Sequence, residues 1–197
     1  GISHELTSIG MSGALDNNTS VNASMVTDDG RGGLSVFGQR RSRDGYDADG
    51  DGFTEIPALN TITIGTRGHL RLNSFSKLKF EYHGVKEFRR GGDQLDRPAH
   101  EALIAEQTEH INNSGSLSYE GQSQDGKHIW NAYVSAQHIS RNSYYGSGMD
   151  PKAYGRTTDL TAVGGVQYSY KFNRLLFMPS QLTAGMEYNF DDMKDKS

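Results

Sequence analysis

The residues with the clearest chemistry lie in one short acidic segment, DADGDGFTE. Asp47, Asp49 and Asp51 stand at the first, third and fifth positions of an EF-hand-type calcium loop, and glycine stands at the sixth. Phe53 contributes its main-chain carbonyl at position seven, and Glu55 supplies an acid at position nine. Calcium selects several oxygen ligands, and glycine permits the sharp turn that gathers them. We therefore predict a calcium site formed by these five residues.

The segment departs from an EF-hand in two respects. Position twelve falls on Ala58, where an EF-hand has a bidentate glutamate. No helical periodicity flanks the loop, so the helix-loop-helix unit is excluded and only the loop chemistry remains. The alternative interpretation is an acidic turn that is simply exposed to water.

A second candidate group combines arginines with a histidine. Arg89 and Arg90 precede two glycines, and His100 follows further along the same segment. Two guanidinium groups offer planar donor pairs to a carboxylate or phosphate, which predicts contact with an anionic substrate. The alternative is a charged turn at the rim of the fold. A zinc-helix motif starting at His100 is excluded because position 104 is isoleucine.

A third candidate group is aromatic. Tyr144 and Tyr145 precede the flexible sequence GSG, and Tyr154 and Arg156 follow it. Stacking tyrosines beside an arginine suit a ring-bearing or sugar-like ligand, and anchoring at a membrane interface is an equally good interpretation.

Several function classes lack support. The chain has no cysteine, and no G-x-S-x-G elbow occurs, so we do not expect an enzyme. The net charge is −4, and no basic run with interleaved aromatics indicates nucleic acid as a partner. No apolar run reaches the roughly 18 residues of a transmembrane helix.

The elements that must position these groups are strands. From Lys77 to Phe88 apolar and charged residues alternate, which places them on opposite sides of a strand. The same alternation recurs in the segments 21–27, 34–40, 62–72, 110–120, 129–138, 162–172 and 182–190. We predict an all-β antiparallel up-and-down meander of about nine strands, with one short helix at 101–107.

Short and long connections alternate along the chain. The segments 28–32, 73–76, 121–127 and 173–181 read as tight turns, and 43–59, 89–109 and 143–159 read as long loops. In a meander, alternate connections lie at opposite ends of the sheet. This asymmetry, with one apolar and one polar face, predicts part of a transmembrane β-barrel, although a β-sandwich also shows alternation.

The chain also resembles a known family. The stretches that carry the resemblance are RDGYDADGDGFTEIP, EYHGVKEFRRGGDQLDRPAHEALIAEQTEH, SYYGSGMDPKAYGRTTDLTAVGGVQY and LFMPSQLTAGMEYNF. Over residues 5–195 it is similar to the barrel of TonB-dependent outer-membrane receptors of Bacteroidetes type. The resemblance implies a plugged barrel of about 22 strands in the outer membrane of a Gram-negative bacterium. It further implies active uptake of a nutrient such as a siderophore, cobalamin, haem or glycan.

The resemblance covers only part of such a receptor. The plug, through which the family contacts the TonB complex, is not in the sequence, and the chain ends in DDMKDKS without a closing aromatic strand. Residues 1–197 are therefore expected to be one segment of the barrel wall, in contact with membrane lipid. Open strand edges and an apolar face predict self-association in water. The alternative is a calcium-stabilised soluble or surface β-sandwich that serves binding or adhesion.

Overall fold

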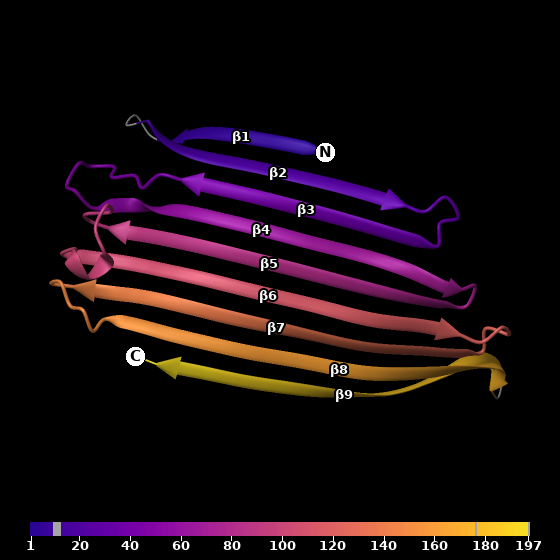
Figure 1. Ribbon diagram of the computed structural model, residues 1–197. Coiled ribbons are helices and arrows are strands. Elements are labelled where there is room, and N and C mark those ends of the chain that lie inside the picture. Colours follow the sequence, from indigo (N-terminus) through magenta and orange to yellow (C-terminus); the bar gives the residue numbers. More distant parts are fainter. Residues whose placement is uncertain (10–12, 176, 197) are drawn as a thin grey trace.

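A computed structural model describes residues 1–9, 13–175 and 177–196. In this part of the chain almost every segment is strand, and the one helical turn is a 3₁₀ helix, η1 (Ala99–Glu101). The strands are β1 (Ile2–Ile9), β2 (Ala14–Val26), β3 (Gly32–Arg43), β4 (Thr54–Asn73), β5 (Ser76–Gly92), β6 (Ile104–Gln122), β7 (His128–Ser147), β8 (Tyr154–Leu175) and β9 (Met178–Lys196) (Figure 1).

The nine strands form one antiparallel sheet in which every strand pairs with its neighbours in sequence. The order is β1 to β9 without a crossover, which confirms the predicted all-β up-and-down meander (Figure 1). Among the described residues β1 pairs only with β2, and β9 pairs only with β8. The sheet is therefore open and does not close into a barrel within this chain.

The two faces of the sheet differ in chemistry. Residues paired across an antiparallel ladder point to the same side of the sheet. The register therefore shows which residues of neighbouring strands share a face. The apolar face includes Val21, Leu34, Ile64, Phe80, Leu117, Val134, Val166 and Met186. The polar face includes Asn18, Gln39, Arg67, Glu81, Ser116, Ser135, Gln167 and Glu187.

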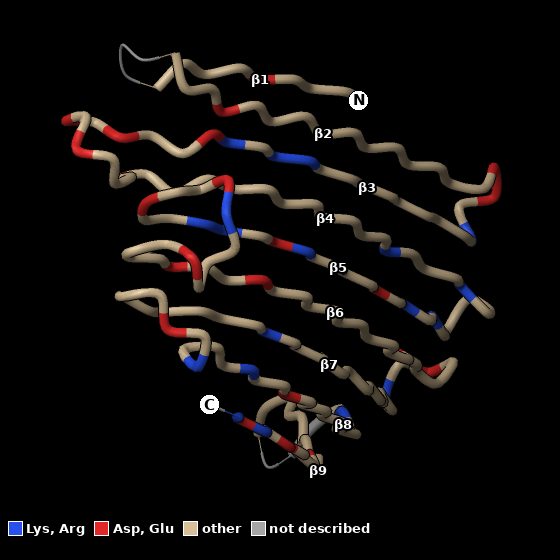
Figure 2. Tube along the Cα trace, turned by 60° about the vertical axis from the view of Figure 1, so that its left-hand side comes forward, with Lys and Arg blue, Asp and Glu red and all other residues tan. Residues whose placement is uncertain are grey.

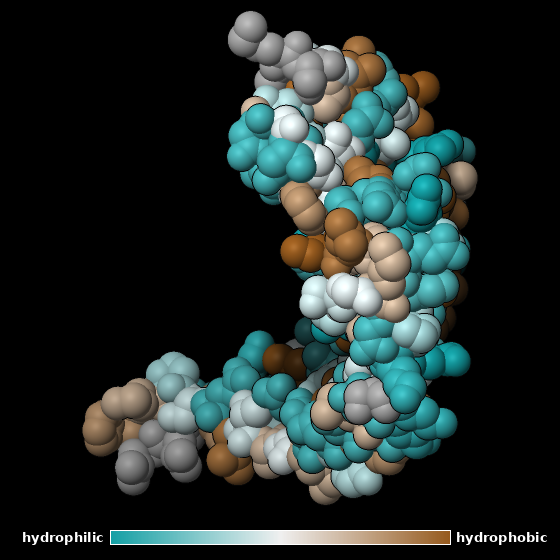
Figure 3. Space-filling model, turned by 90° about the vertical axis from the view of Figure 1, so that its left-hand side faces the viewer, coloured by the Kyte–Doolittle hydropathy of each residue, from teal (hydrophilic) through white to brown (hydrophobic). Residues whose placement is uncertain are grey.

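The sheet is bent, and the polar face lies on its inner side. Figure 3 shows the sheet from the end that carries the long loops as an open arc, with hydrophobic residues at its upper outer margin and a further hydrophobic group on its inner side. On the polar face, side chains of alternate strands meet: the Tyr133 hydroxyl of β7 donates to Glu187 of β9. The rings of Phe37 in β3 and His83 in β5 lie 5.8 Å apart. In both contacts an aromatic side chain lies over the glycine of the intervening strand, Gly165 or Gly65.

The described residues form almost no hydrophobic core. The buried hydrophobic cluster consists of Ala99, Ala102, Ala105 and Tyr144, at the long-loop end of the sheet. Large side chains in the middle of the apolar face are exposed: Val134 is 52% exposed and Met186 is 76% exposed. The described residues provide no second layer that covers this face.

Two local predictions were wrong. The expected helix at 101–107 is absent, because Ile104 already begins β6 and pairs with Ser147 of β7. Ladder hydrogen bonds to two neighbouring strands outweigh the weak helix propensity of this segment. The long links are also shorter than expected, at 44–53, 93–103 and 148–153, because β4 to β8 continue into them. No described helix is long and apolar enough to cross a membrane.

The contact between alternate strands depends on a glycine. A Cβ atom on Gly165 would lie 2.7 Å from the ring of Tyr133, whereas one on the preceding Gly164 would meet nothing closer than 3.6 Å. We expect Gly165→Ala to displace Tyr133 from Glu187 and to cost about 1–3 kcal/mol in the free energy of unfolding. Gly164→Ala should have little effect, and chemical denaturation of both variants gives the comparison. Equal costs would contradict this role of Gly165.

Candidate functional site

The acidic loop lies between β3 and β4, at the long-loop end of the sheet. Figure 2 shows its acidic residues in red. Asp47, Asp49, Asp51 and Glu55 each offer a carboxylate oxygen, and these oxygens lie within 4.8 Å of one another. The cluster is largely exposed. The structure thus brings the four predicted carboxylates together, and this donor set could hold a hard divalent cation.

The local hydrogen bonds explain why the carboxylates converge. Asp47 accepts from the main-chain N–H groups of Gly50 at 2.7 Å and Gly52 at 2.9 Å. Both glycines have positive φ angles of 79° and 92°, which other residues rarely adopt. The bonds from Gly52 and Gly50 lower the pKa of Asp47 below its usual value. The loop therefore holds Asp47 in its charged form.

The remaining predicted ligands complete the same turn. Asp51 accepts from the N–H of Phe53 at 2.8 Å, and Glu55 accepts from the N–H of Ala48 at 2.6 Å. An isolated bridge between Tyr46 and Ile56 closes the loop at its base. The bridge and the bond to Ala48 bring Glu55, at the start of β4, back to the first carboxylates.

The two arginines do not form a pair. They are neighbours within β5 and thus point to opposite faces of the sheet. Arg90 is only 2% exposed, and its guanidinium donates to the carbonyl groups of Gly91, Asp93 and Gln94. Arg89 lies on the polar face and pairs with Glu87 at 3.3 Å. Arg90 thus holds the 93–103 loop against the end of the sheet.

The tyrosine group is divided between the same two faces. Tyr144 is fully buried, and its ring packs at a tilt of 58° against that of Tyr154, with ring centroids 4.8 Å apart. His100 bonds to the Tyr154 hydroxyl at 2.9 Å on this side of the sheet. Tyr145 points to the polar face, where the Arg141 guanidinium lies 5.7 Å from its ring. Arg156 is exposed on the apolar face.

The seven residues predicted to bind a ligand therefore form no single cluster. Arg90, His100, Tyr144 and Tyr154 lie around the folded 93–103 loop on the apolar side. Arg89 and Tyr145 belong to the polar face, which is the concave one. Alternation within a strand separates each adjacent pair.

Among the described residues, the buried hydroxyl of Tyr144 has no hydrogen-bond partner. An unpartnered buried polar group costs free energy, so removing it should not weaken the fold. We expect Tyr144→Phe to leave the free energy of unfolding unchanged or to raise it by about 1 kcal/mol. Tyr144→Ala should lower it by about 3–5 kcal/mol through lost packing. Urea denaturation tests both variants, and a clear loss in Tyr144→Phe would indicate a partner for the hydroxyl.

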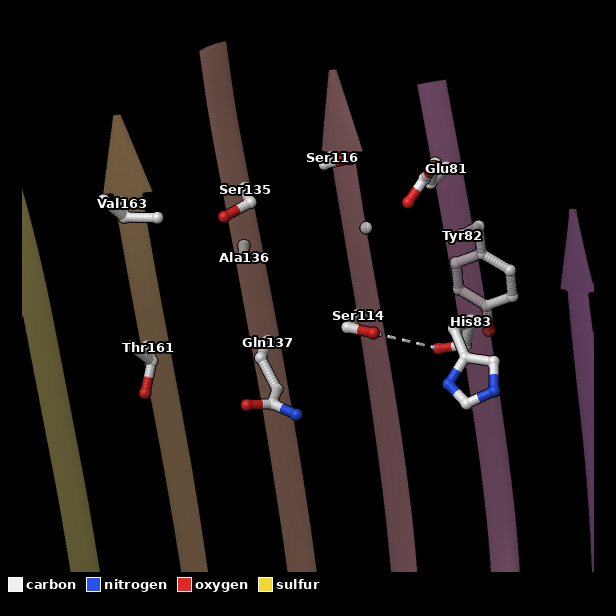
Figure 4. Close-up of a pocket in the computed structure, with 11 residues that line it drawn as sticks. Glu81, Tyr82, His83, Ser114, Ser116, Ser135, Ala136, Gln137, Thr161 and Val163 are labelled. Carbon is white, nitrogen blue, oxygen red and sulfur yellow. Dashed lines mark hydrogen bonds between the residues drawn. The ribbon is translucent and has the colours of Figure 1, made fainter. Parts of the chain in front are cut away.

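Sequence reasoning missed a groove on the polar face. It has a volume of about 360 Å³ and is lined by small polar side chains from β5 to β8 (Figure 4). Ser114, Ser135 and Gln137 lie on its floor, and His83 lies at one side, where its carbonyl accepts from the Ser114 hydroxyl at 3.5 Å. The feature of the sequence that could have indicated this groove is the run Ser-Gly-Ser-Leu-Ser at 114–118, which places small polar side chains on one face of β6. The groove offers hydroxyl and amide groups to a hydrated ligand.

Comparisons with models of known families, with curated proteins and with solved structures found no match. The resemblance to TonB-dependent receptors therefore stays a prediction.

Proposed function

We propose that this chain is part of the wall of a transmembrane β-barrel in the outer membrane of a Gram-negative bacterium. The barrel would belong to a TonB-dependent receptor that imports a nutrient such as a siderophore, cobalamin, haem or glycan. One observation carries the proposal: a single bent sheet has its polar face on the inside and an uncovered apolar face on the outside. A barrel with a hydrated lumen in a bilayer needs this arrangement.

The apolar face has the dimension that a bilayer requires. We define the apolar band as its central part, which spans residues 62–70 of β4, 160–172 of β8 and 182–190 of β9. A tilted strand crosses a membrane with about 9–11 residues, so these segments are long enough. The strands continue beyond the band toward the long loops.

Aromatic residues form the end of the apolar band nearest the short turns. They lie on the apolar face and comprise Tyr119, Trp130, Tyr168, Tyr170 and Phe172. Amphipathic rings collect where hydrocarbon meets headgroups, and outer-membrane barrels carry such girdles. This border supports a membrane boundary at the turn end.

The long-loop end supports a role in recognition. We infer that the carboxylates of the acidic loop bind calcium, with the carbonyl of Phe53 as a further oxygen ligand. A bound ion would cancel the repulsion between the carboxylates and stiffen the loop at the mouth of the barrel. The competing β-sandwich needs a second sheet, and the described residues form only one.

Cysteine labelling tests the membrane orientation, because the chain has no cysteine of its own. Val134→Cys lies on the apolar face and Ser135→Cys on the polar face, at adjacent positions of β7. In phosphatidylcholine vesicles a water-soluble maleimide should label position 135 rapidly and position 134 slowly. Brominated lipid should quench the fluorescence of Trp130, which excludes burial of the apolar face against protein. Rapid labelling of both positions would contradict the proposal that the apolar face meets lipid.

Nutrient uptake is tested with the full-length receptor that this proposal implies. Cells that produce it should accumulate one of the four nutrient classes in a manner that depends on the proton gradient of the inner membrane. Accumulation that persists after the gradient is collapsed would contradict TonB-driven transport.

A further inference from the structure

Basic side chains collect on the apolar face where the apolar band ends toward the long loops. The register places Arg40, Ile62 and Lys86 side by side in one lateral row. The same row continues through Ile111, Ser140 and Thr158 to Lys194. The next row toward the loops holds Arg156 and Lys196. We call Arg40, Lys86, Arg156, Lys194 and Lys196 the basic rim.

The rim is only weakly neutralised by protein carboxylates. Glu109 is the acid that the described strands place in these two rows, and it lies 3.9 Å from Lys86. Asp192, one row closer to the band, lies 3.0 Å from Lys194. The side chains of Lys86 and Lys194 remain 60% and 69% exposed. Exposed pairs of this kind are weak, so the cations stay available to other anions.

The opposite border of the band differs. In the two rows that hold Trp130 and His128, the apolar face of β6 to β9 also carries Tyr168 and Tyr170, and the side chains that the structure describes in these rows include no Lys, Arg, Asp or Glu. Among the described side chains of β6 to β9, the charge on this face therefore gathers at the border toward the long loops. A general need for solubility would not restrict it in this way.

We propose that the basic rim binds the phosphate groups of anionic lipid headgroups in the leaflet on the long-loop side. This inference rests on the proposed membrane orientation. Long cationic side chains reach from the edge of a hydrocarbon layer into the headgroup region. Arg40 and Lys86 lie two strands apart, about 10 Å, so neighbouring headgroups can engage them separately.

The test compares two charge-matched triple variants. The rim variant combines Arg40→Gln, Lys86→Gln and Lys194→Gln. The control combines Arg67→Gln, Arg71→Gln and Lys171→Gln, which remove the same charge from the polar face. Fluorescence of Trp130 reports insertion into vesicles of phosphatidylcholine alone and of phosphatidylcholine with an equal part of phosphatidylglycerol.

The unmodified chain and the control should partition more strongly into the anionic vesicles. The rim variant should lose this preference, by roughly fivefold for each cation and about 100-fold in all. The preference of the unmodified chain should also weaken as salt is raised, a measurement that needs no variant. An undiminished preference in the rim variant, or an equal loss in the control, would contradict lipid binding by the basic rim and would leave the proposed membrane role unaffected. Failure of every form to insert into either vesicle would overturn the proposed membrane role.

Discussion

Replacing Val166 by arginine is expected to destabilise the sheet folded in a bilayer by about 2–4 kcal/mol. Val166 lies in the middle of the apolar band, where its side chain is 50% exposed and pairs laterally with Ala132 and Met186. At this depth a guanidinium has neither water nor a carboxylate partner. Urea titration of folding in phosphatidylcholine vesicles, followed by Trp130 fluorescence, measures the loss.

The adjacent position provides the control. Gln167→Arg introduces the same side chain on the polar face, where we expect a hydrated lumen. The stability of the folded sheet in the bilayer should therefore hardly change. The difference between the two variants therefore isolates the side of the sheet from the effect of added charge. Equal losses at the two positions would mean that the apolar face does not meet lipid.

The second large effect is expected in the acidic loop. Asp49→Asn combined with Asp51→Asn should weaken calcium binding about 100-fold, which corresponds to roughly 2.7 kcal/mol. Asparagine keeps one oxygen and the size of each side chain, so the loss reflects the two negative charges. Titration calorimetry with calcium chloride measures the affinity of both forms.

A matched double variant elsewhere removes the same charge. Asp28→Asn with Asp96→Asn changes two exposed acids outside the cluster and should leave calcium affinity unaltered. If the unmodified chain binds no calcium, or the control loses as much affinity as the loop variant, the calcium assignment fails.

The same loop should respond to acid. Main-chain donors lower the pKa of Asp47 from its ordinary value of 3.8, so its contribution to loop stability is present above that pH. The contribution is lost as the pH falls through the lower pKa of the folded state. Nuclear magnetic resonance of the Gly50 and Gly52 amides should show the loop opening below about pH 4. Opening at neutral pH would contradict the bonds to Asp47.

The alternation in the sequence predicted the strands well for a simple physical reason. An extended chain places successive side chains on opposite sides, so Leu78 and Phe80 had to share one face while Lys79 lay on the other. The clustering of carboxylates in the acidic loop also depends on residues that are close together in the sequence. Carboxylates two residues apart, joined by glycines, converge without help from distant parts of the chain.

Features that depend on contacts between strands were not predictable. The strands extended further into the connections than their alternation indicated, because pairing with neighbours on both sides stabilises even weakly patterned segments. Arg90 and Tyr144 looked like loop residues that face a ligand. The 93–103 loop instead folds over them and buries both.

By itself the sequence determined that this protein is built from antiparallel strands with one apolar and one polar face, and that four carboxylates converge in one loop. Both properties arise between residues close in the chain, where backbone geometry leaves little choice. Only the tertiary structure decided that the polar face is concave and that Arg40, Lys86 and Lys194 stand in one row. These properties follow from the register and curvature of the whole sheet, to which residues far apart in the sequence contribute together.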